Sequence, residues 1–276
     1  MIYLLLLAAL PLAAQPLRVY SEFSRISPSG EVVEIDRSDS DPREILSPAV
    51  PRNGFASYHI VATIPAGKPF IFTIGQNPED AVAVTMYREL HDENGIPDKL
   101  EPVTLPYEAT APEAGQPLVF WMDMWSDRNA PVRRIKVEPQ LHIEGYWYTY
   151  PMEVRVSSPV VPAFKLTPWN LAPPAARSDA DIQSAVRGLL CSVGPATAAA
   201  PPAPTVRSLL QRNLQQDMAL ARDRYPREMT FKVLMDAANV KTAAEWCNAI
   251  KTRPTGGLNA EWFLKVRDFL YRAALN

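Results

Sequence analysis

The chain has 276 residues, of which 28 are basic and 30 are acidic, for a formal net charge of −2 at pH 7. Its hydrophobic fraction of 47% supports packed cores and excludes a disordered chain. The basic residues are dispersed, so the composition does not favour a nucleic-acid-binding protein. The 28 prolines and 11 glycines suit strand ends and extended linkers better than phosphate-binding loops.

Residues 1–14 predict a signal peptide. Residues 1–12 are uncharged and apolar, and the small residues Ala13 and Ala14 precede the expected cleavage site before Gln15. The apolar run is shorter than the roughly 20 residues that a membrane-spanning helix requires, and no second long apolar run follows. We therefore expect an exported protein, periplasmic or extracellular, without a transmembrane segment.

Residues 15–157 predict a β-sandwich domain. Apolar residues alternate with a period of two, as in Phe70, Phe72 and Ile74, and turn residues separate the alternating runs. Eight or nine strands are expected, and because no helical crossover lies between them, the sheets are expected to be antiparallel. The architecture that fits is an immunoglobulin- or fibronectin III-like sandwich, although the Cys pair and core Trp of antibody domains are missing.

Residues 158–178 predict a proline-rich linker, and residues 179–276 predict a small α-helical domain. In the latter region apolar residues recur with a helical period, for example Val206, Leu209 and Leu210, and five helices are expected. The predicted fold class is therefore α+β in two segregated domains.

The two cysteines, Cys191 and Cys247, both lie in the predicted helical domain. In an oxidising compartment the simplest interpretation is a disulfide, which would contribute about 4 kcal/mol by restricting the unfolded chain. A catalytic thiol is the alternative, and the absence of histidine from this region argues against it.

The two predicted domains differ in charge. Residues 15–176 carry 14 basic and 21 acidic side chains, a net of −7, and residues 177–276 carry 14 and 9, a net of +5. Ordinary solvated faces and an interdomain contact would explain this difference. The alternative is a basic helical domain that faces an anionic envelope surface.

Residues 118–125 are the densest aromatic segment. Strand alternation places Trp121, Asp123 and Trp125 on one face, opposite an apolar face. Indole rings beside a carboxylate are typical of sugar-binding surfaces, and exposed tryptophans also anchor protein partners. The alternative is that the linker or the helical domain covers this face and makes it interior.

A second aromatic segment places three tyrosines on one side of another predicted strand, which makes them candidates for partner binding. These are Tyr146, Tyr148 and Tyr150.

Metal and cofactor sites are not expected. His142 and Glu144 share a strand face, with His59 as a third candidate, but a strand pair supplies only two ligands for zinc. The acidic stretch 91–98 lacks the ligand spacing of an EF-hand loop and fits a hairpin turn better.

No nucleophile elbow, zinc-protease, phosphate-loop or dinucleotide motif is present, so a non-enzymatic protein is favoured. The first functional hypothesis is an exported binding or envelope-associated protein that engages a protein or glycan partner through an aromatic face. The alternatives are a polysaccharide hydrolase and a purely structural two-domain protein. The hydrolase would use paired carboxylates from a set of four: Asp123, Asp127, Glu89 and Glu144.

Overall fold

The computed structural model describes residues 15–33, 47–91, 93, 95, 97–163, 204–206, 209–210, 212–213, 216–217, 219–220 and 267. Its elements are strands. In chain order they are β1 (Leu17–Ser21), β2 (Ala49–Arg52), β3 (Gly54–Ala62), β4 (Pro69–Asn77), β5 (Ala83–His91), β6 (Pro97–Val103), β7 (Tyr107–Thr110), β8 (Leu118–Ser126), β9 (Arg134–Ile143), β10 (Tyr146–Thr149) and β11 (Glu153–Val160).

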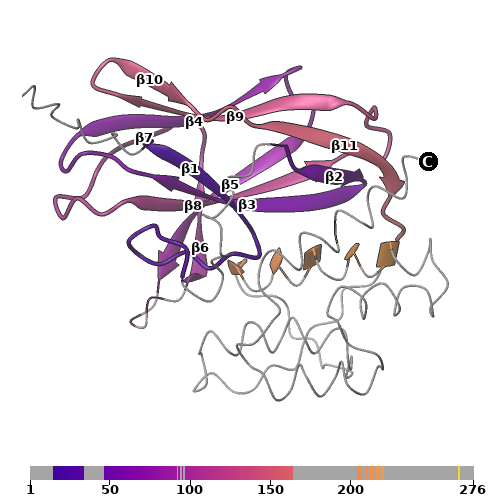
Figure 1. Cartoon of the computed structure of the whole chain (residues 1–276), viewed down its shortest axis with the longest axis horizontal. Coiled ribbons are helices and arrows are strands. Elements are labelled where there is room, and N and C mark those ends of the chain that lie inside the picture. The colour runs from indigo at the N-terminus through magenta and orange to yellow at the C-terminus, as the bar shows by residue number, and fades with distance from the viewer. Residues whose placement is uncertain are drawn as a thin grey trace, which may run out of the picture.

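The strands form two sheets. The first sheet has five strands in the order β1-β3-β8-β5-β6. The second sheet has six strands: five follow the order β2-β11-β9-β4-β7, and β10 pairs with β9. Figure 1 shows the sheets as two layers, with β4, β9 and β11 lying over β3 and β8.

The main hydrophobic core lies between the two layers. The rings of Phe72 in β4 and Phe120 in β8 stack with their centroids 4.7 Å apart, and both side chains are fully buried. Met122, Met124 and Leu141 belong to the same core. The sequence prediction that alternate side chains of these strands face the core is therefore confirmed.

The outward face of the first sheet is also buried along β3 and β8. Nearly every residue of these two strands is buried, so burial does not alternate as it does in a sheet with one wet face. At one end, residues of the loop after β1 complete a satellite cluster of Tyr20, Ile26, Val32, Val61 and Val119. A second satellite cluster lies beside it on β8, where Val206 and Leu209 pack on Leu100 and Trp121.

The prediction of a separate helical domain, and with it the α+β fold class, is wrong for the part of the chain that the structure describes. That part is all β, and no separate helical domain is seen in it. Single residues between 206 and 220 have helical backbone geometry, but they lie directly on the first sheet (Figure 1). The physical reason is that a helical period reveals an apolar stripe without revealing what the stripe packs against.

The wholly antiparallel arrangement also needs correction, because β2 and β11 pair in parallel. The connection between them is the rest of the sandwich, β3 to β10, so no helical crossover is required. The eleven described strands also exceed the seven to nine of the expected immunoglobulin architecture.

Several predictions about the ends of the chain lie outside the described residues: the signal peptide 1–14, the linker 158–178 beyond residue 163, and most of residues 179–276. Strand β11 ends at Val160, three residues after the predicted boundary of the β domain. Among the described residues, no helix has the length and apolarity that a membrane span requires.

Replacing Phe120 with Ala should lower the free energy of unfolding by about 3–5 kcal/mol, because it leaves a cavity beside Phe72 in the centre of the core. Urea denaturation followed by far-UV circular dichroism measures this change. Val132, which is 48% exposed, provides the control, since Val132→Ala should change stability by less than about 0.5 kcal/mol. Equal losses in the two variants would contradict this description of the core.

Candidate functional site

The aromatic face predicted on residues 118–125 lies on β8 and is largely covered. Trp121 is fully buried, Asp123 is 6% exposed, and Trp125 is half-buried. The three side chains share the outward face of the first sheet, because their neighbours Phe120, Met122 and Met124 point into the core. In this arrangement Trp121 is not available to a partner.

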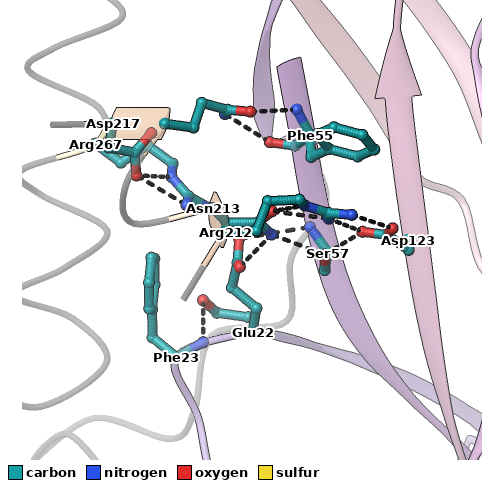
Figure 2. Close-up of polar contacts among 11 residues, drawn as sticks. Glu22, Phe23, Phe55, Ser57, Asp123, Arg212, Asn213, Asp217 and Arg267 are labelled. Atoms are coloured by element: carbon teal, nitrogen blue, oxygen red, sulfur yellow. Dashed lines mark hydrogen bonds and ion pairs between the residues drawn. The ribbon is translucent and has the colours of Figure 1, made fainter. Parts of the chain in front are cut away.

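Asp123 is held by a guanidinium group from the C-terminal part of the chain. Arg212 donates from its two terminal nitrogens to the two carboxylate oxygens of Asp123, at 3.0 and 2.6 Å. The Ser57 hydroxyl donates to Asp123 Oδ1 at 2.6 Å, as Figure 2 shows. These three donors occupy both oxygens of the buried carboxylate, so Asp123 does not face a surface from which it could act as a catalytic acid or nucleophile.

A second carboxylate, Glu22, closes the same network from the loop after β1. It accepts hydrogen bonds from Asn213 Nδ2, at 2.6 Å, and from Arg267. Arg267 also bonds Asp217, with 3.0 Å between Nε and Oδ2 (Figure 2). Burial raises the pKa of Glu22 above its usual range, although the positive charge of Arg267 opposes the shift.

Phe55 of β3 contacts two residues from the C-terminal part of the chain, Gln216 and Arg212. Gln216 accepts from the Phe55 backbone N–H at 2.6 Å and donates to its carbonyl at 2.9 Å, so one side chain satisfies both main-chain groups. The Arg212 guanidinium lies 3.5 Å from the centroid of the Phe55 ring, a cation–π contact. We call Glu22, Ser57, Asp123, Arg212, Asn213, Asp217 and Arg267 the docking network, because it joins four described residues from the C-terminal part of the chain to the first sheet and the loop after β1.

Beside the docking network, a buried histidine pairs with a buried glutamate. His59 Nδ1 and Glu89 Oε1 are 2.5 Å apart, and both side chains are almost inaccessible to solvent. The ring of Trp121 meets the His59 ring edge-on with centroids 4.9 Å apart. Burial favours the neutral imidazole, but the charge and hydrogen bond of Glu89 outweigh it and raise the pKa of His59.

The second predicted aromatic segment contains the most exposed aromatic side chains of the described residues. Tyr146 is 70% exposed and Tyr148 is 39% exposed, both on β10. Tyr150 is only 1% exposed and belongs to the main core, so it does not share their surface. The three tyrosines do not form one binding face, because the chain leaves the strand between Thr149 and Glu153.

Trp147, which the sequence analysis did not select, is 55% exposed between the two tyrosines. Alternation places it on the opposite face of β10, where its ring lies 4.9 Å from the ring of His142, its cross-strand neighbour. The signal in the sequence is the unbroken run Tyr146-Trp147-Tyr148, which places apolar residues on both faces of one strand. We call Tyr146, Trp147, Tyr148 and His142 the hairpin surface.

The tight turn between β9 and β10 holds the hairpin surface at the end of the second sheet. Glu144 and Gly145 both have positive φ, at 51° and 86°, as a two-residue type I′ hairpin turn requires. Glu144 also pairs with Lys68, with 2.7 Å between Oε1 and Nζ. Figure 1 shows β10 at the upper edge of the molecule, far from the described residues between 204 and 220.

The other sequence candidates lie apart. His59 belongs to the first sheet and His142 to the second, so they do not converge on a metal ion. The described residues contain no group of three or more His, Cys, Asp or Glu side chains arranged to hold a metal.

Asp127 accepts a turn hydrogen bond from the Asn129 backbone N–H at 2.7 Å. Cys191 and Cys247 lie outside the described residues, and their disulfide stays a prediction.

Comparison with known proteins identifies no family model and no curated protein that matches this chain. Among solved structures, a family 123 glycoside hydrolase from Clostridium perfringens matches 53% of this chain at 11% identity, with a TM-score of 0.34. The match spans 28% of the hydrolase chain. A Caenorhabditis elegans MSP family member, WR4, matches 40% of this chain and 92% of its own at 8% identity, with a TM-score of 0.24. At these scores neither likeness carries a functional argument.

Replacing Arg212 with Leu should destabilise the protein by about 3–5 kcal/mol, because Asp123 would remain buried without its counter-charge. Adding Asp123→Asn should recover part of this loss, since the buried charge is then removed. Urea denaturation at pH 7 measures both changes. The control is Arg134→Leu, which breaks the solvent-exposed pair with Glu153 and should cost about 1 kcal/mol or less. A loss no larger in Arg212→Leu than in Arg134→Leu would argue against the docking network.

The His59–Glu89 pair should make stability depend on pH. The folded-state pKa of His59 is raised above 6.5. The contribution of the pair to the free energy of unfolding is therefore complete below pH 6.5 and is lost as the pH rises through the folded-state pKa. In the variant Glu89→Gln, burial of His59, the largest single effect on its pKa, is opposed only by the weaker effects of Glu22 and should reverse this trend, so that stability falls as the pH is lowered. Free energies of unfolding between about pH 5.5 and 9.5 measure the two slopes. Parallel pH profiles would show that the pair does not couple to folding.

Proposed function

We propose that this protein is a non-enzymatic, exported binding protein that engages a protein or glycan partner through the hairpin surface. The observation that carries the proposal is the exposure of three consecutive aromatic side chains on β10: Tyr146, Trp147 and Tyr148 are 70%, 55% and 39% exposed. Besides Val132, these are the exposed large hydrophobic residues of the described chain. Removing three aromatic rings from water is a strong driving force for association.

The chemistry of the hairpin surface supports recognition of a partner with both apolar and polar groups. Trp147 offers a broad ring face beside the imidazole of His142, and Tyr146 and Tyr148 present phenol hydroxyls from the other face of β10. Aromatic residues of this kind bring large contact areas with few rotatable bonds, so a partner immobilises them at low entropic cost. The same features suit the CH faces of sugar rings and the side chains of a protein.

Two of the four candidate carboxylates of the hydrolase alternative, Asp123 and Glu89, are buried. Asp123, the first candidate carboxylate, already accepts three hydrogen bonds and is covered by Arg212. Glu89, the second, is buried against His59. Neither Asp123 nor Glu89 lies on a surface that a polysaccharide chain could contact. The aromatic side chains of the hairpin surface, in contrast, are exposed.

Replacing Trp147 with Ala should weaken partner binding by about thirtyfold or more, the effect expected of a central aromatic anchor. One measurement is co-sedimentation of purified protein with insoluble peptidoglycan and chitin. The other is photo-crosslinking from a benzoyl-phenylalanine at position 148, followed by titration of the identified protein partner. The variant Val132→Ala is the matched control, because Val132 is exposed outside the hairpin surface. Binding that Trp147→Ala and Val132→Ala change equally, or no binding in either arm, would refute the proposed function.

A further inference from the structure

The outer edge of β10 faces solvent. Among the described strands, β10 pairs only with β9. The strand that follows it, β11, lies on the same side of β9 and carries β2 on its own outer edge. This edge of the second sheet is therefore covered along β11 and open along β10.

The register of the hairpin determines which backbone groups point toward the open edge. The two-residue turn makes Ile143 and Tyr146 a hydrogen-bonded pair, and such pairs alternate along an antiparallel ladder. The N–H of Tyr150 donates to the Pro139 carbonyl at 2.9 Å, which agrees with this alternation. The N–H and C=O groups of Trp147 and Thr149 consequently point away from β9, toward solvent.

β10 lacks the usual features that prevent edge strands from pairing. Its four residues, Tyr146–Thr149, include no charged side chain and no proline, and all four are exposed. Natural sheets normally protect such an edge with lysine, proline, a bulge or a covering loop. An uncharged aromatic edge strand with outward backbone groups is a template for another strand.

We propose that the open edge of β10 pairs with β10 of a second copy of this chain. In an antiparallel arrangement around a twofold axis at Tyr148, Trp147 lies opposite Thr149 of the partner subunit, and Thr149 lies opposite Trp147 of the partner subunit. The two residues of each such pair exchange two backbone hydrogen bonds. The outward-pointing N–H and C=O groups of Trp147 and Thr149 are thereby satisfied in both copies. At the axis, Tyr148 faces Tyr148 of the partner subunit as a close, non-hydrogen-bonded aromatic pair.

The absence of charge on β10 favours a second copy as the partner, and the small contact area predicts a weak dimer. A strand that pairs with itself must not place like charges opposite each other, and β10 has none. The formal net charge of the chain, −2, adds little long-range repulsion between copies. A four-residue edge buries less than the roughly 1,200 Å² of a stable interface, so we expect a reversible monomer–dimer equilibrium.

Dimerisation would change how the hairpin surface binds, an extension that rests on the proposed function. A twofold axis perpendicular to the joined sheets keeps Trp147 of both copies on the same face. Strand spacing and rise place their Cα atoms about 8 Å apart. Two indole rings at this separation, each beside a His142, would form one continuous platform for an extended ligand with repeated units.

Sedimentation-velocity experiments on the full chain under non-reducing conditions test the dimer, over about 5 to 500 µM. The wild type should show a concentration-dependent dimer. Thr149→Pro removes an outward-pointing N–H in each copy and so two of the four hydrogen bonds, which should raise the dimer dissociation constant about tenfold or more. The matched control, Thr149→Val, keeps the N–H and should dimerise like the wild type.

A cysteine at the proposed axis tests the register without relying on the proline variant. Non-hydrogen-bonded antiparallel pairs have Cα atoms about 4.5 Å apart, within disulfide range, so Tyr148→Cys should form a disulfide-linked dimer under mild oxidation. Tyr146→Cys, two residues from the axis, should not, and the wild type controls for Cys191 and Cys247.

A monomer at every concentration, or a dimer that Thr149→Pro leaves unchanged, would overturn this inference. Equal crosslinking of Tyr148→Cys and Tyr146→Cys would overturn the register. The proposed function fails separately, through equal binding by Trp147→Ala and Val132→Ala. If the wild type is monomeric but partner binding still depends on Trp147, a second copy does not pair with β10, and the hairpin surface remains a binding site.

Discussion

The arrangement of the described chain depends on the burial of charge on the outward face of the first sheet. Glu22, Asp123 and Asp217 meet Arg212 and Arg267 in a space that also contains Ser57 and Asn213 (Figure 2). Removing these carboxylates from water is costly unless guanidinium groups accompany them. The β sheet and the C-terminal residues are thus mutually dependent, because each supplies the counter-charges that the other needs. Directional hydrogen bonds, such as the two between Arg212 and Asp123, then determine where the C-terminal residues lie.

This dependence divides the molecule into a covered side and an open side. The first sheet buries both faces of β3 and β8, including Trp121, His59 and the carboxylate of Asp123, which would otherwise form a polar aromatic surface. The second sheet leaves β10 exposed at its edge, with aromatic side chains on both faces of the strand. Aromatic residues of similar chemistry therefore have different roles: Trp121 completes a satellite core, whereas Trp147 remains accessible to a partner.

The predicted strands agree well with the structure where local rules apply, and the site agrees less well. Alternation correctly divides β8 into Phe120, Met122 and Met124 on one face and Trp121, Asp123 and Trp125 on the other. The burial of the second face could be named only as an alternative, because it results from Val206, Leu209 and Arg212, which lie more than 80 residues later in the chain. Trp147 was overlooked because selection by alternation favoured the tyrosines on its other side. Ser57 and His59, which resemble solvent-facing residues of a strand, are buried for the same long-range reason.

The sequence by itself determined the strands, their core-facing residues and the apolar stripe that begins at Val206, since these follow from side-chain periodicity and turn chemistry. Only the tertiary structure decided that the stripe covers the first sheet, that β2 joins β11 in parallel, and that Tyr150 is buried while Tyr146 and Tyr148 are exposed. The physical reason is that periodicity shows which residues share a face, whereas burial depends on what the fold places against that face. That contact is made by segments far apart in the chain, and no local pattern records it.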